Sequence, residues 1–62
     1  MDAYGIVGRT EHEARETLNR RGLILRVTDR DGRACPGSYD LMPERVNVAV
    51  VAGTVTEILS RG

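Results

Sequence analysis

A chain of 62 residues allows one domain, and a domain of this size buries only about 60% of its unfolded surface. Nine arginines balance nine acidic residues, and this zero net charge gives no general electrostatic basis for nucleic-acid binding. The single cysteine excludes an intramolecular disulfide, and the sequence suggests no metal cluster and no cofactor. Phe and Trp are absent, so we expect an aliphatic core of Val, Leu, Ile and Ala.

The first five residues, 1–5, lack the basic and apolar regions of a signal peptide. No apolar run approaches the ~20 residues that a membrane-spanning helix needs. The sequence as it stands therefore predicts a cytoplasmic protein without a membrane partner. A leader outside these residues would make it a secreted protein.

The first predicted element is a helix that begins after Thr10. Thr10 is a favourable N-cap, and Glu13 stands three residues later, as a capping box requires. Ala14 and Leu18 lie four residues apart and predict a narrow inward stripe that packs closely on a sheet. Gly22 predicts the C-terminal end of the helix.

Three strands are predicted, over residues 23–29, 45–51 and 54–59, with a tight turn at 52–53. Residues 30–44 separate the first two strands, and this length suits a parallel crossover better than a hairpin. We therefore expect one domain over 1–62 with an α+β fold. One helix packs on a small mixed three-stranded sheet, and a long extended binding loop joins two parallel strands.

The strand over 45–51 alternates in polarity, so its two faces are predicted separately. Three valines are expected to face the core, and three other residues are expected to face outward, on the side opposite the helix. The inward set is Val46, Val48 and Val50, and the outward set is Arg45, Asn47 and Ala49.

The loop over 30–44 is polar and carries one aromatic residue, Tyr39, between Pro36 and Pro43. A compact domain this small rarely contains so long a connection unless the connection is functional. An extended segment that displays one large side chain is typical of a loop that a protease binds.

The remaining polar residues have plainer interpretations. His12 lies on the helix without a second His or a Cys nearby and is expected at the surface. Asp40 and Glu44 have no nucleophile or metal ligands around them, so the chain is not expected to be an enzyme. Cys35 is expected to be a small, partly buried residue of a monomer. An exposed Cys35 would instead allow a disulfide-linked dimer.

Taken in order, several short motifs resemble the potato type I family of serine-protease inhibitors, and most closely its short bacterial relatives. Val7–Thr10 with Glu13-Ala14 resembles the start of the family helix, and Asp31-Gly32 resembles the start of its loop. Residues 40–48 resemble the loop exit and the central strand. Residues 53–56 and Gly62 resemble the last strand and its end.

The resemblance implies an inhibitor that binds a protease as a substrate that does not leave. The loop adds main-chain hydrogen bonds to the cleft, and Tyr39 fills the primary specificity pocket, with Tyr39–Asp40 as the scissile-like bond. A large aromatic residue suits serine proteases of the subtilisin or chymotrypsin type, whereas trypsin is a poor match. The implied protease-binding residues are Gly37, Ser38, Tyr39, Asp40, Leu41 and Met42.

The resemblance also implies how the loop is held without a disulfide. Arg45 is the supporting arginine, Asp40 is its carboxylate partner, Ser38 is the flanking hydroxyl, and Pro43 stiffens the downstream limb. Asn47 is a further support residue, although plant members often carry a second arginine there. Gly37 replaces a bulkier residue and adds loop entropy, which lowers the expected affinity.

Two alternatives remain open. The segment from Gly8 to Leu23 also resembles the opening of PASTA domains, which bind cell-wall fragments, but that likeness fades after Val27. The inhibitor fold could also be reused as a non-inhibitory binding or adaptor module.

Overall fold

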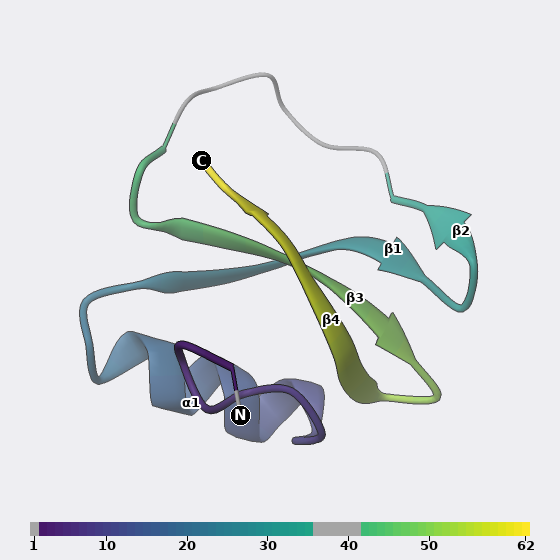
Figure 1. Cartoon of the computed structure of the whole chain (residues 1–62), viewed down its shortest axis with the longest axis horizontal. Helices are drawn as coiled ribbons and strands as arrows, with labels where there is room; N and C mark the ends of the chain where they lie inside the picture. Colours follow the sequence, from purple (N-terminus) through teal and green to yellow (C-terminus); the bar gives the residue numbers. More distant parts are fainter. Residues whose placement is uncertain (1, 36–41) are drawn as a thin grey trace.

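The computed structural model describes residues 2–35 and 42–62 (Figure 1). Along this part of the chain lie α1 (Glu11–Asn19), β1 (Ile24–Arg30), β2 (Arg33–Ala34), β3 (Arg45–Val51) and β4 (Thr54–Arg61). The strand order is β2-β1-β3-β4; β1 is parallel to β3, and the other pairs are antiparallel. The predicted α+β fold, with one helix on a mixed sheet and a parallel pair, is confirmed.

The predicted number of strands is wrong, because the described residues form four. The additional strand, β2, is two residues long and pairs with the end of β1. Asp31 and Gly32 join the two strands with φ angles of 52° and 81°. Positive φ at both central residues is what a two-residue hairpin turn needs, and Asp-Gly supplies it readily.

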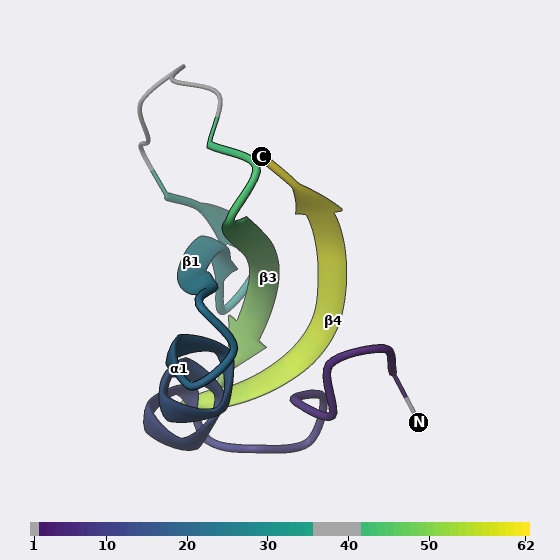
Figure 2. The same cartoon turned by 90° about the vertical axis from the view of Figure 1, so that its left-hand side faces the viewer.

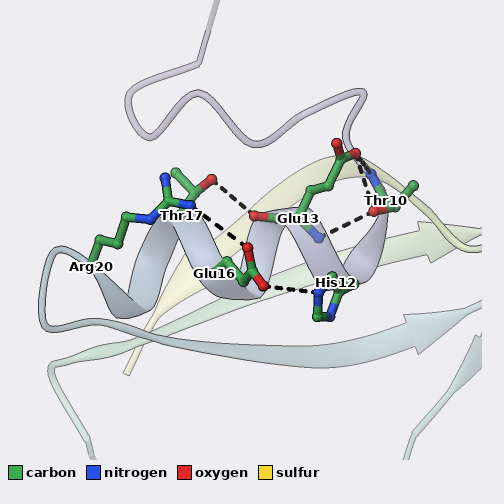
Figure 3. A network of polar contacts seen from close by, with 6 residues as sticks. All are labelled: Thr10, His12, Glu13, Glu16, Thr17 and Arg20. Carbon is green, nitrogen blue, oxygen red and sulfur yellow. Dashed lines mark hydrogen bonds and ion pairs between the residues drawn. The ribbon is translucent and has the colours of Figure 1, made fainter.

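The start of α1 follows the prediction (Figure 3). The Glu13 amide donates to Thr10 Oγ1, and the Thr10 amide donates to Glu13 Oε1, both at 3.1 Å. The exposed side of the helix adds a contact of 2.9 Å between His12 and Glu16, and His12 lies at the surface as expected. The reciprocal cap satisfies amides that an uncapped helix leaves without partners.

The end of α1 is set by Gly22, although the regular helix stops earlier, at Asn19. Gly22 has a φ of 74°, and the Leu23 amide returns to the Leu18 carbonyl at 2.9 Å. This long return bond with glycine at a left-handed position is the Schellman ending of a helix. The glycine therefore turns the chain from α1 directly into β1.

The core lies between α1 and the sheet. Ala14 and Leu18 are fully buried and form the predicted inward stripe of the helix. Alternate residues of β1 and β3 meet them, joined by one residue from the N-terminal segment and one from β4. The complete cluster is Ile6, Ala14, Leu18, Leu25, Val46, Val48, Val50 and Val55, and it is aliphatic as expected.

The strand β4 is longer than predicted and curves along the edge of the sheet (Figure 2). Its register against β3 shifts twice, between Asn47 and Val48 and between Ala49 and Val50. Each shift places an extra residue in β4, and such bulges bend and twist a strand. As a result, the end of β4 lies beside the chain that leads into β3.

The opposite face of β3 carries two buried polar residues. Arg45 and Asn47 lie on the face opposite the valines, as expected, and they are 9% and 8% exposed. Met42 contacts the guanidinium of Arg45, and the end of β4 covers the amide of Asn47. Within the described residues, no helix is long and apolar enough to cross a membrane.

Candidate functional site

Most of the predicted protease-binding loop lies outside the part of the chain that the structure describes. Gly37, Ser38, Tyr39, Asp40 and Leu41 lie outside the described residues. The described chain stops at Cys35, whose amide donates to the Thr28 carbonyl of β1 at 2.9 Å, and Cys35 is partly buried as expected. It resumes at Met42, at the other end of the parallel pair. The register of the loop and the partnership of Asp40 with Arg45 therefore stay predictions.

Four predicted residues are described, and they gather where the chain enters β3: Met42, Pro43, Arg45 and Asn47. We call Met42–Arg45 the loop base. Arg45 is the first residue of β3, and its Nη2 donates to the sulfur of Met42. A guanidinium is costly to bury unless its N–H groups find acceptors. The sulfur of Met42 is one such acceptor.

Backbone hydrogen bonds fix the course of the loop base. The Arg45 amide donates to the Met42 carbonyl at 2.9 Å and closes a turn. The Ile24 amide of β1 donates to the Glu44 carbonyl, and the Gly62 amide donates to the Arg45 carbonyl, both at 2.8 Å. The downstream end of the loop is therefore attached to β1 on one side and to the end of β4 on the other.

Asn47 connects β3 to the last residues of the chain. Its Nδ2 donates to Ser60 Oγ and to the Gly62 carbonyl, both at 3.0 Å. Its Oδ1 is buried and finds no hydrogen-bond partner among residues 2–35 and 42–62. Asn47 thus supports the loop base indirectly, by holding the segment whose Gly62 amide binds Arg45.

Arg61 is a functional candidate that the sequence interpretation missed. Its Nε donates to the Pro43 carbonyl at 2.9 Å, its Nη2 donates to the same oxygen, and its Nη1 donates to Tyr4 Oη at 2.8 Å. A shallow hollow at this junction is lined by Met42, Pro43, Arg61 and Gly62. Extending the antiparallel pairing beyond residue 59 would have brought the end of β4 near the loop base, but the two bulges that set its register are not evident in the sequence.

The described polar contacts attach the loop base to neighbouring strands. Among residues 2–35 and 42–62, no group of three or more His, Cys, Asp or Glu side chains could hold a metal ion. Acceptor carbonyls of the loop base meet arginine and amide donors that come from other strands. Such an arrangement fixes a backbone segment in one conformation.

Comparisons with protein-family models, with curated proteins and with solved structures find no match for this chain. The described geometry is a parallel pair, β1 and β3, with the buried Arg45 at the first residue of β3.

Proposed function

We propose that this protein inhibits a serine protease of the subtilisin or chymotrypsin type by presenting a substrate-like loop. Tyr39 enters the primary specificity pocket, and Tyr39–Asp40 is the scissile-like bond. The observation that carries the proposal is the position of Arg45. Arg45 is 9% exposed at the first residue of β3, and its Nη2 donates to the sulfur of Met42 in the loop base. An arginine without a structural role at the start of a strand is usually exposed to solvent, whereas Arg45 is buried.

The attachment of the loop base adds a second argument. A flexible peptide loses conformational entropy when it binds a cleft, and a loop that is already ordered does not. Hydrogen bonds from Ile24, Gly62 and Arg61 hold the carbonyls of residues 43–45 from two neighbouring strands. They stiffen the limb that follows the scissile-like bond, which is the limb that must stay in place after a cut for the bond to rejoin.

The experiment that tests the function is a titration of subtilisin and chymotrypsin with the purified protein. We expect inhibition at micromolar concentration or below, and we expect trypsin to be unaffected. Tyr39→Gly should abolish inhibition because it removes the side chain that fills the apolar pocket. Tyr39→Phe keeps the ring and is the matched control; it should inhibit nearly as well as the wild type.

Two outcomes would contradict the proposal. One is an absence of inhibition by the wild type, which would favour a non-inhibitory binding or adaptor module. The other is inhibition that Tyr39→Gly leaves unchanged, which would move the contact to another part of the molecule.

A further inference from the structure

The end of β4, the loop base and the N-terminal segment meet at one side chain, Arg61. Its guanidinium forks around the Pro43 carbonyl with Nε and Nη2 and uses Nη1 to reach the hydroxyl of Tyr4. A guanidinium presents its N–H groups in a rigid plane, so three bonds to two partners fix its orientation. Arg61 therefore links segments that lie far apart in the sequence.

Tyr4 is itself held in place. The Arg61 and Arg21 guanidinium carbons lie 5.8 and 5.7 Å from the centre of its ring, within the range of cation–π contacts. The turn that carries Tyr4 is closed by the Asp2 carboxylate, which accepts hydrogen bonds from the amides of Tyr4, Ile6 and Val7 at 3.1–3.2 Å. The partner of Arg61 is thus part of an ordered turn, and Ile6 anchors that turn in the core.

The oxygen that Arg61 binds has a particular place in the chain. Pro43 has no N–H, so its carbonyl is the only backbone group through which it can be attached. The next carbonyl, that of Glu44, accepts from the Ile24 amide of β1. Two successive carbonyls are therefore held by two different elements, and together they set the direction in which the chain approaches β3.

We propose that Arg61 is a positioning residue of the inhibitory loop, which fixes the loop base through the Pro43 carbonyl while Tyr4 holds the guanidinium. The effect on inhibition rests on the proposed function, but the effect on the loop base does not. Because Arg61 is exposed, its removal should change global stability little. Its removal should instead increase local opening of the hydrogen bonds that hold the loop base.

The test compares Arg61→Ala and Arg61→Lys with the wild type. Arg61→Lys keeps the charge but loses the fork, so it should resemble the alanine variant more than the wild type. Arg20→Ala is the matched control, because Arg20 is an exposed arginine that pairs with Glu16 in a contact of 3.6 Å on α1 and, among the described residues, has no hydrogen bond or ion pair with the loop base. Amide hydrogen exchange is measured at Arg45 and Ile24, whose acceptors are the Met42 and Glu44 carbonyls, and at Val48 and Val50 as core references.

In Arg61→Ala we expect exchange at Arg45 and Ile24 to accelerate about tenfold while the core amides stay near their wild-type rates. Inhibition constants for subtilisin should rise about tenfold, and cleavage between Tyr39 and Asp40 should become faster. The control Arg20→Ala should change neither readout.

Each result decides the proposal. Unchanged exchange at Arg45 and Ile24 would overturn it, and so would equal acceleration throughout the core, which would indicate general destabilisation. Local acceleration in a protein whose wild type inhibits neither protease would keep Arg61 as the residue that fixes the loop base and reject the inhibitory function. Local acceleration with an unchanged inhibition constant would show that the loop base does not control inhibition, and would also overturn it.

Discussion

At the scale of single residues, the site depends on polar side chains that are buried although they lie on the face away from the core. Arg45 and Asn47 are both less than a tenth exposed. Their buried N–H groups must keep their hydrogen-bond acceptors, because an unsatisfied buried N–H costs about 1–3 kcal/mol. Each side chain therefore holds its neighbours in position more firmly than a solvated one would.

Arg45 gives the first prediction at this scale. Arg45→Ala removes the guanidinium that contacts Met42, and under the proposed function the protein should change from a slowly cleaved inhibitor into a faster-cleaved substrate. The cut should remain between Tyr39 and Asp40, as mass spectrometry of a timed subtilisin digest would show. Arg45→Lys keeps the charge but not the planar guanidinium and should give an intermediate rate. Cleavage at another bond would mean that the register of the loop is wrong, and an unchanged rate would mean that Arg45 does not support it.

At the scale of elements, the sequence predicted those features that depend on neighbouring residues. The helix start followed from Thr10 and Glu13, and its end followed from Gly22. The tight turn at 52–53 and the strand over 45–51 were also found as predicted. In each case, a hydrogen bond or a positive φ within a few residues decides the structure. The strand β2 could have been found in the same way, because Asp31-Gly32 is a strong hairpin signal.

Features that depend on pairing between distant segments were not predictable in this way. The bulges of β4 change the spacing of its inward residues from two to three, so Val55 and Ile58 both contact the core. Simple alternation places Ile58 on the outside. For the same reason, the role of Arg61 could not be found, since it depends on a register that only the packed sheet establishes.

The attachment of α1 to β1 gives a prediction of pH dependence. Glu11 in the first turn of α1 lies 2.8 Å from Arg30 of β1 and 3.2 Å from Arg15. The hydrogen bond from Arg30 holds the pKa of Glu11 below its ordinary value of 4.5, against the opposing effect of desolvation. A carboxyl whose pKa is lower in the folded state stabilises the fold above the unfolded-state pKa. That contribution is lost as the pH falls from about 4.5 through the lowered pKa.

Glu11→Gln should therefore reduce the free energy of unfolding at pH 7 and remove part of its decline below pH about 4.5. Urea unfolding at a series of pH values measures both effects. The remaining decline belongs to other carboxyls such as Asp2, whose lowered pKa reflects amide hydrogen bonds that outweigh desolvation. Glu16→Gln is the matched control, since the contacts of Glu16 lie within the exposed face of the helix. Parallel pH profiles for the wild type and Glu11→Gln would contradict the assignment.

At the scale of the whole molecule, both ends of the described chain are linked to the loop base, the C-terminal end directly through Arg61 and Gly62 and the N-terminal segment through the contact of Tyr4 with Arg61. The N-terminal segment supplies Tyr4 and Ile6, and the Gly8 amide and the Arg9 carbonyl bind Val55 at the start of β4. The other end of β4 supplies Arg61 and Gly62. Contacts between such distant segments exist only in the folded state. The loop base is therefore ordered only as long as the small core holds the sheet together.

The core is so small that truncation of one buried side chain should unfold a large fraction of the molecules, and the loop base with them. A domain of 62 residues has a free energy of unfolding of about 3–9 kcal/mol, and truncation of a buried leucine costs about 2–5 kcal/mol. Leu18 is fully buried between α1 and the sheet, whereas Leu59 in the bulged part of β4 is 45% exposed. Leu18→Ala should thus leave a large unfolded fraction at 37 °C and lose inhibition in proportion, while Leu59→Ala should stay folded and active. Urea unfolding followed by circular dichroism gives the stabilities, and titration of subtilisin at 15 and 37 °C gives the active fractions. Equal losses in the two variants would mean that the core does not set the order of the loop base; inhibition by Leu18→Ala that recovers on cooling would show that it does.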